Sequence, residues 1–263
     1  MIRRLVLAAV LGAAVFAAIS ASASAAPSAK TLLFCSDISY PPEGMVLNGK
    51  NTGSDIDIGT EVAKRLGMTA QFQNTGFDGI VAALLSNKCD AIISGMNDTP
   101  QRRKSISFVD YLSVGQSLIG KKGNPLKINT PLDVCGRVAG AQVATTNLET
   151  LQSLDKRCKA KGKSGIKVIS FKEDPLGVTA LKTGHLDIYE SDSPPAVWYT
   201  TKNTALQIVG KPITPQPVGI GLNPKDTATK ANVQKAINAM YKDGTMTKIL
   251  KKWNMVAFAL KGK

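Results

Sequence analysis

The sequence predicts an α/β protein built from two similar lobes. Short β-prone runs alternate along the chain with amphipathic helical stretches, which is typical of α/β architecture. One unit also occurs twice: helix, polar turn, aspartate and strand lead to Asp90 and, with the same spacing after an Ala-Leu pair, to Asp187. The repeat indicates two related lobes, and we expect the chain to cross between them twice.

The spacing of apolar residues locates the elements of the first lobe. Residues 31–35 are expected to form a strand and residues 57–66 a helix, because apolar side chains recur at four-residue spacing and a glycine follows. A second helix over 79–85 leads into a strand over 90–94.

Two β-prone segments flank the second copy of the unit. They cover residues 113–121 and 214–222, and we expect them to be the strands of a hinge. The last segment is helical over 228–241 and 245–253, and it should pack back on the first lobe. A cleft between two such lobes is a usual place for a small ligand.

Residues 1–25 are expected to be a signal peptide. Arg3 and Arg4 precede an apolar run that ends at Ile19, and residues 23–25 supply the small side chains of a cleavage site. The mature protein would then be periplasmic, with no lipid or membrane anchor.

The chain is strongly basic, with 33 Lys and Arg against 19 Asp and Glu and a net charge of +14. The lysines are scattered and aromatic residues make up only 5% of the chain, so no basic stripe or stacking platform for nucleic acid emerges. We therefore expect no nucleic-acid partner. The charge favours solubility and weak attraction to anionic surfaces.

The four cysteines favour disulfides over a metal site in an exported protein. The chain has no C-x-x-C and one histidine, which argues against structural zinc. Cys135 and Cys158 flank one strand–helix unit and are the first expected pair. Cys35 ends one predicted strand and Cys89 begins another; in parallel strands their sulfurs would lie too far apart, so their pairing stays open.

The segment from Ser94 to Arg103 gathers anion-binding chemistry at the end of a predicted strand. Gly95 allows a close turn past a ligand, and Thr99 before Pro100 predicts a helix N-cap with proline at the first helical position. Exposed N–H groups, small polar side chains and an arginine would hold a carboxylate well. Taken alone, the segment is better explained as a surface turn that carries two solvated arginines; the rest of the chain reverses that preference.

Seven segments carry a family resemblance, with order and spacing that agree throughout. They are residues 36–42, 53–57, 79–84, 89–102, 106–111, 140–146 and 187–192. The chain resembles the amino-acid-binding proteins of ABC transporters, specifically solute-binding family 3, the polar amino acid type. It departs from that pattern at Glu43, where an aromatic residue is usual, at Ser54, also usually aromatic, and at Ala144, usually glycine.

The resemblance implies a type II periplasmic binding protein fold, with two α/β lobes joined by a two-strand hinge. Residues 27–116 with 218–263 would form lobe I, and residues 117–217 lobe II. It also implies a receptor that captures an amino acid and delivers it to the membrane subunits of an ABC permease. We expect a monomer without cofactor, metal or catalytic activity.

Nine ligand contacts follow from the resemblance. Arg102 matches the residue that binds the α-carboxylate, Thr145 a second carboxylate contact from lobe II, and Asp192 the acceptor for the α-ammonium. The other expected contacts are Ser94, Gly95 and Asn97 near the carboxylate, Tyr40 and Phe77 as aromatic walls, and Asp37 facing the ligand side chain.

These roles agree with elementary electrostatics. A zwitterion loses its hydration at high cost unless each charge meets an opposite one, and a guanidinium can hold a carboxylate with two parallel bonds. Thr146 and Glu149 form a Thr-x-x-Glu pattern, which predicts a helix N-terminus beside Thr145.

Three alternatives stay open from the sequence. An enzyme on the same scaffold, such as a dehydratase of a cyclic carboxylic acid, would need a general acid or base in the cleft, for which Glu190 or Asp192 could serve. The ligand could be an opine or another modified amino acid. A ligand-sensing receptor domain is the third, although no signalling region follows in this sequence.

Overall fold

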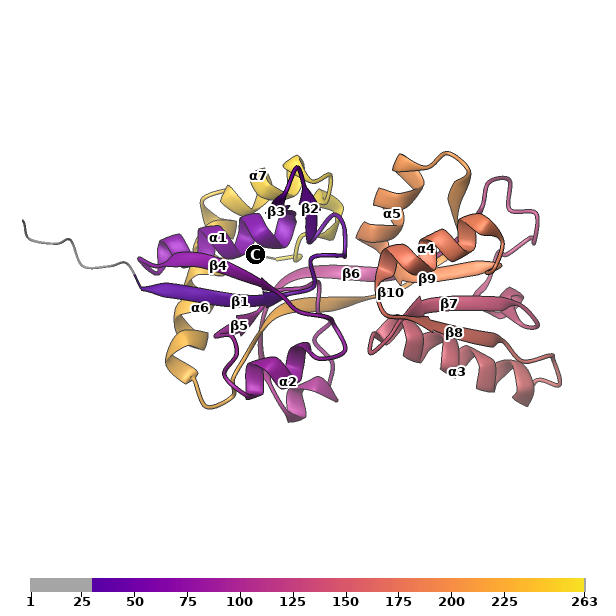
Figure 1. Cartoon of the computed structure of the whole chain (residues 1–263), viewed down its shortest axis with the longest axis horizontal. Helices are drawn as coiled ribbons and strands as arrows, with labels where there is room; N and C mark the ends of the chain where they lie inside the picture. The colour runs from indigo at the N-terminus through magenta and orange to yellow at the C-terminus, as the bar shows by residue number, and fades with distance from the viewer. Residues whose placement is uncertain (1–29, 263) are drawn as a thin grey trace, which may run out of the picture.

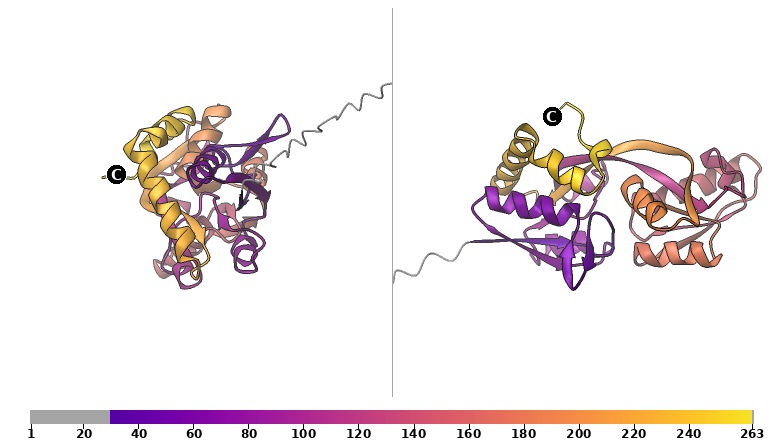
Figure 2. Two further views of the ribbon diagram at one scale, coloured as in Figure 1. Left: turned by 90° about the vertical axis from the view of Figure 1, so that its left-hand side faces the viewer. Right: turned by 90° about the horizontal axis from the view of Figure 1, so that it is seen from above.

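The computed structural model describes residues 30–262, so the expected signal peptide lies outside the described residues. Two lobes lie side by side, joined by two long strands, β6 (Ser107–Lys121) and β10 (Leu206–Leu222) (Figure 1). Figure 2, right, shows these strands bridging the lobes along one side. Both extend beyond the segments predicted for the hinge, because each pairs within both lobes.

Lobe I combines the start and the end of the chain. Its helices α6 and α7 pack against α1 and the sheet, as the sequence predicted for the C-terminal segment. Its elements are β1 (Thr31–Ser36), β2 (Met45–Leu47), β3 (Lys50–Thr52), α1 (Ser54–Arg65), β4 (Thr69–Asn74), α2 (Ile80–Leu85), β5 (Ala91–Ile92), η1 (Arg102–Lys104), α6 (Thr227–Lys242), α7 (Thr245–Lys252) and η3 (Val256–Phe258).

Lobe II contains the central part of the chain. Its elements are η2 (Pro131–Val134), β7 (Val138–Gln142), α3 (Thr146–Ala160), β8 (Lys167–Phe171), α4 (Asp174–Thr183), β9 (Ile188–Asp192) and α5 (Ser193–Lys202). No helix within residues 30–262 is both long and apolar enough to cross a membrane.

One eight-stranded sheet runs through both lobes in the order β4-β1-β5-β10-β6-β9-β7-β8. The outer strands of each lobe are parallel, while the two crossing strands are antiparallel to each other. The pairing of β10 with β6 is irregular between Val209 and Gln216. This irregular stretch supports our proposal that the lobes divide near residues 116–117 and 217–218.

The repeated aspartate has the same structural role in both lobes. Asp90 accepts the Leu33 N–H at 2.8 Å and Asp187 accepts the Val138 N–H at 2.9 Å, each through its carboxylate. Each carboxylate thereby ties the turn before a strand to the neighbouring parallel strand. The sequence repeat thus corresponds to a repeated unit of structure.

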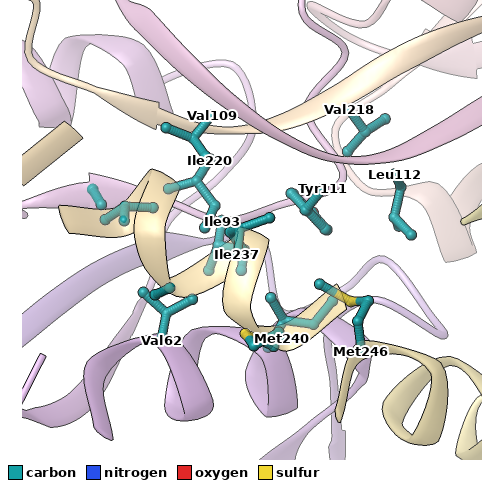
Figure 3. Packing of buried hydrophobic residues seen from close by; sticks show 14 of the residues in the cluster. Val62, Ile93, Val109, Tyr111, Leu112, Val218, Ile220, Ile237, Met240 and Met246 are labelled. Atoms are coloured by element: carbon teal, nitrogen blue, oxygen red, sulfur yellow. The ribbon is translucent and has the colours of Figure 1, made fainter. Parts of the chain in front are cut away.

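The cores of the lobes are separate clusters of apolar side chains. Figure 3 shows the main cluster of lobe I, in which Val62 of α1 and Ile237 and Met240 of α6 meet Ile93 and Ile220 of the sheet region. In lobe II, Leu181 of α4 is fully buried against Ile119 and Tyr189.

Both cysteine pairs form disulfides. Cys135–Cys158 joins the start of lobe II to α3, with a Cα–Cα distance of 5.6 Å. Cys35–Cys89 also forms, at 5.7 Å. The objection from parallel strands was wrong, because Cys89 precedes β5 and lies with Cys35 in the apolar cluster beneath α2.

Two helix starts differ from the sequence prediction. The first helix begins at Ser54 rather than residue 57, because Asp55 and Ile56 are themselves buried and add part of a turn. The N-cap of α3 is Thr145, not Thr146: Thr145 Oγ1 accepts the Leu148 N–H at 3.2 Å. Thr99 Oγ1 accepts the Arg102 N–H at 3.2 Å, but the element that follows is the short η1, whose N-cap is Gln101.

Replacing Leu181 by alanine should lower the free energy of unfolding by ~2–5 kcal/mol, since it opens a cavity in the lobe II core. Leu176 lies on the same helix but is 52% exposed, so Leu176→Ala should change it by less than about 0.5 kcal/mol. Urea unfolding followed by circular dichroism measures both. Equal effects would contradict the described packing of α4.

Candidate ligand-binding site

Several predicted site residues lie at the ends of strands that face the space between the lobes. Asp37 follows β1, Ser94 and Gly95 follow β5, and Asp192 ends β9 in lobe II, where Gln142, which was not predicted, ends β7. In α/β sheets the carboxyl ends of parallel strands are the usual place for a ligand.

Arg102 connects the two lobes. Its Nη1 donates to Asn97 O at 2.8 Å, and its Nη2 donates across the cleft to Ala144 O at 3.1 Å. The Phe77 ring lies beneath the guanidinium, with its centroid 5.3 Å from Cζ. Burial lowers the pKa of Arg102, while the negative charges of Glu149 and Asp192 oppose that shift. An arginine so placed stays protonated near neutral pH.

Two further contacts across the cleft involve predicted residues of lobe I. Asn97 Oδ1 accepts the Thr146 hydroxyl at 2.7 Å, and Asp37 Oδ2 accepts from Gln142 Nε2 at 2.7 Å. Ser94 has a supporting position, because its hydroxyl accepts the Asp37 N–H at 2.9 Å.

Tyr40 forms another contact between the lobes. Its hydroxyl oxygen lies 3.3 Å from the Asp192 nitrogen and accepts that N–H. Its ring packs on Gly95, where a Cβ atom would lie only 3.1 Å from Tyr40 Cε1. Gly95 has φ +55°, so both its backbone conformation and the space beside it favour glycine.

Asp192 is deeply buried between the lobes. Burial raises its pKa to about 7, even though Asn147 donates to it and Arg102 is near. Asn147 Nδ2 lies 3.3 Å from Asp192 Oδ1. Thr145 caps α3 beside this carboxylate, and the first N–H groups of a helix lack intrahelical acceptors, so they can bind an anion.

These contacts surround a narrow pocket whose empty space, part of it open to solvent, is about 230 Å³. Six of the nine predicted ligand contacts line it, and Asp37, Ser94 and Arg102 lie behind or beside its wall. The lining residues are Tyr40, Phe77, Gly95, Asn97, Gln142, Thr145, Asn147 and Asp192.

Sequence reasoning missed four polar residues at this site. Gln142 and Asn147 line the cavity, and both fall in or beside the matched segment 140–146, which was the available signal. Asp174 begins α4 and accepts the hydroxyl groups of Tyr189 at 2.7 Å and Ser191 at 3.2 Å. Burial raises the pKa of Asp174 to about 6.

Asp55, the fourth, holds the loop after β5 in place. Its carboxylate accepts the Gly95 N–H at 2.7 Å and the Tyr111 hydroxyl at 2.7 Å. Desolvation by burial raises its pKa to about 6. Asp55 lies in the matched segment 53–57, but nothing in the sequence alone connected it to Gly95.

The structure adds detail for three residues near the site. Glu43 is only 2% exposed, and burial beside Asp55 raises its pKa well above the usual range. Arg103 is not simply solvated, because it forms an ion pair with the buried Asp98 carboxylate. Ala144 adopts φ +61°, the left-handed conformation that the usual glycine would take more easily.

The site has a large excess of acidic groups. Asp37, Glu43, Asp174, Glu190 and Asp192 are all buried in this region, and none of them forms an ion pair within residues 30–262; the charge of Arg102 acts on Asp192 without a direct contact. Within residues 30–262 no three of the His, Cys, Asp and Glu side chains are grouped so that they could hold a metal ion.

This geometry is that of a two-lobed protein with a polar pocket between its lobes. The sequence profile of the bacterial extracellular solute-binding proteins, family 3, matches residues 32–256. The chain therefore belongs to that family.

Individual relatives agree with this assignment. The L-cystine-binding protein TcyJ of Escherichia coli (strain K12) is 29% identical over 226 residues, which cover 85% of this chain and 82% of TcyJ. An ancestral arginine-binding protein bound to arginine is 34% identical, with a TM-score of 0.78, over 86% of this chain and 99% of that one. The ancestral amino acid-binding protein AncCDT-1, described as a precursor of cyclohexadienyl dehydratase, is 30% identical with a TM-score of 0.78, over 85% and 95% of the two chains.

Arg102→Ala should weaken binding of the amino acid ligand by ~2–5 kcal/mol, because a charged, hydrogen-bonded partner is removed. Isothermal titration calorimetry measures the change with the ligand that best stabilises the wild type in a thermal-shift screen. Lys104→Ala is the matched control, since Lys104 is exposed on the same turn. Retention of affinity within about tenfold in Arg102→Ala would refute the assigned role.

The ligand-free protein should lose stability as pH rises through the pKa of Asp55. This pKa is about 6 in the folded state and 3.8 in the reference state. The contribution of the protonated Asp55 carboxyl group to the free energy of unfolding is therefore fully present below about pH 4 and is lost as pH rises through 6. Between pH 4.5 and 7.5 this group should lower the free energy of unfolding by about 2 kcal/mol.

Asp55→Asn should remove that contribution. Urea unfolding of both proteins at pH 4.5 and 7.5 compares the two differences, and all other carboxyl groups titrate in both proteins. The same pH dependence in wild type and variant would show that Asp55 does not titrate as described.

Proposed function

We propose that this protein captures a free α-amino acid with a cationic side chain between its lobes and presents it to an ABC permease. The observation that carries the specificity is the excess of buried carboxyl groups around a single guanidinium. Family membership supports the transport role, since the relatives named above are amino-acid-binding proteins.

Arg102 is assigned to the α-carboxylate of the ligand. Its guanidinium donates to two neutral backbone carbonyls, at Asn97 and Ala144, and lies over the Phe77 ring, but it forms no ion pair within residues 30–262. A carboxylate would replace these with charge-assisted hydrogen bonds, which are roughly twice as strong. Thr145 and the N-terminus of α3 would supply further N–H groups, and Ser94, Gly95 and Asn97 would complete this end of the site.

Asp192 is assigned to the α-ammonium. The carboxyl group is buried, with its pKa raised to about 7, and an ammonium beside it would favour the ionised form. Because Arg102 belongs to lobe I and Asp192 to lobe II, one zwitterion would contact both lobes and favour the closed arrangement. Tyr40 and Phe77 would enclose the aliphatic part of the ligand.

Asp37 and Asp174 are assigned to the far end of the ligand. Asp37 lies near enough to Asp174 for its charge to raise the pKa of that carboxyl. Gln142 and the hydroxyl groups of Tyr189 and Ser191 supply hydrogen bonds but no positive charge. A guanidinium or ammonium on the ligand would provide the missing charge.

Location and assembly complete the proposal. We place the mature protein in the periplasm after removal of residues 1–25, as a monomer. The signal-peptide pattern and the family's extracellular relatives support this placement.

Catalysis is the second candidate, and one observation favours it. Glu190 is fully buried, and burial beside Asp192 raises its pKa well above the usual range, as a general acid would require. The similarity to AncCDT-1, an ancestral amino acid-binding protein described as a precursor of a dehydratase, also supports this candidate. We nevertheless propose a receptor without enzymatic activity, because Arg102 and Asp192 together suit a zwitterion. Mass spectrometry of cyclic carboxylic acids incubated with the protein tests this, and product formation would refute it.

Asp37→Asn should reduce the affinity for L-arginine by ~10-fold or more while changing the affinity for L-glutamine far less. The variant removes the negative charge of Asp37 and keeps its size, and only L-arginine has a side-chain charge to pair with it. Calorimetry with both amino acids and an opine measures this, and Asp78→Asn, exposed beside Phe77, is the control. Wild-type protein that binds L-glutamine or the opine more tightly than L-arginine and L-lysine would overturn the proposed specificity.

A further inference from the structure

A second groove lies between the lobes, separate from the cavity at Arg102. It is formed where α5 of lobe II faces α7 and η3 of lobe I (Figure 1), and it contains about 690 Å³ of empty space. Both tryptophans of the chain line it, Trp198 from lobe II and Trp253 from lobe I. Phe258 and two prolines add further apolar surface.

The two lysines of the groove differ in their partners. Lys252 Nζ lies 5.0 Å from the Trp253 ring centroid, but Asp57 Oδ2 already accepts from it at 2.7 Å. Lys202 Nζ lies 5.0 Å from the Trp198 ring centroid and forms no ion pair within residues 30–262. The groove therefore offers indole faces from both lobes together with one cation that has no anionic partner in the described structure.

We propose that this groove binds a small aromatic carboxylate. Its ring would pack against Trp198 and Trp253, since aromatic rings favour offset and edge contacts with one another. Its carboxylate would pair with Lys202. A ligand without a ring would not contact the apolar surface of Trp198 and Trp253, and a ligand without a negative charge would leave Lys202 without an anionic partner.

Residues of the groove are close in sequence to residues of the amino acid site. Pro42 follows Tyr40 by two residues, and Pro194 follows Asp192 by two residues. Tyr40 and Asp192 are in contact between the lobes. A molecule that fits the groove in this geometry therefore favours the arrangement that encloses the amino acid, and by linkage each ligand should tighten the binding of the other. This coupling rests on the function proposed above, whereas binding in the groove does not.

Benzoate tests the site directly. The chain has two tryptophans, so the ¹⁵N-labelled protein gives two indole N–H signals, which Trp198→Phe assigns. Benzoate should shift both signals saturably without any amino acid present, while benzamide and acetate should not. Linear shifts, or equal shifts with benzamide, would overturn the proposal.

Matched lysine variants test the assigned cation. Lys202→Gln should weaken benzoate binding by ~10-fold or more. Lys182→Gln, exposed on α4 of the same lobe, should leave it unchanged. Equal benzoate affinity in wild type and Lys202→Gln would refute the assignment, and so would displacement of benzoate by the amino acid ligand.

Calorimetry of L-arginine with and without saturating benzoate tests the coupling. We expect tighter binding with benzoate in the wild type and no change in Lys202→Gln. If L-arginine does not bind, the proposed specificity is wrong, but the benzoate titration still decides whether the groove binds an aromatic carboxylate. If L-arginine binds with unchanged affinity, the coupling is refuted.

Discussion

The arrangement of the cleft depends on which groups contact the positively charged Arg102 guanidinium. The guanidinium is anchored in lobe I by Asn97 O and reaches lobe II at Ala144 O. The two carbonyl oxygens accept hydrogen bonds from the guanidinium but do not neutralise its charge. A ligand carboxylate would accept hydrogen bonds and also neutralise the charge, so its interaction with Arg102 is stronger in the enclosed state than in solvent. This difference is what a ligand needs in order to shift an equilibrium between open and closed lobes.

The buried carboxyl groups lack the opposite partner: they need positive charge, whereas Arg102 needs negative charge. Burial raises the pKa of Asp192 to about 7 and that of Asp174 to about 6, and it raises the pKa of Glu43 and Glu190 as well. Ionised carboxyl groups at this depth are costly without a cation, and Arg102 can compensate only part of their charge. A ligand with two positive charges and one negative charge would suit this cleft better than a neutral zwitterion. The proposed specificity and the proposed closure therefore rest on the same electrostatic imbalance.

Local patterns predicted much of the fold and part of the site. Asp90 and Asp187 were found from one short repeat because each occupies the same position in a helix–turn–strand unit, but their hydrogen-bond partners, 57 and 49 residues away, were not predicted. The helix beside Thr145 was predicted from capping residues, although one position too late. Partners distant in sequence could not be predicted in this way: Asp55 is 40 residues from Gly95, and Asp37 is 105 residues from Gln142. No sequence period reports such contacts, because they depend on how the two lobes meet.

The hinge and the cleft are joined by polar side chains rather than by apolar packing. Gln116 lies on β6 within the irregular part of the hinge, and its amide is 3.0 Å from Thr146 Oγ1 and 2.8 Å from Thr150 Oγ1. Thr146 in turn donates to Asn97 of lobe I. Hydrogen bonds are directional, so a rotation about the hinge that moved Gln116 relative to α3 would break them, whereas apolar contacts could slide. The closed arrangement is thus specified by a continuous set of hydrogen bonds from the hinge strand to the cleft, and Asn97 is the point at which this set reaches the backbone that holds Arg102.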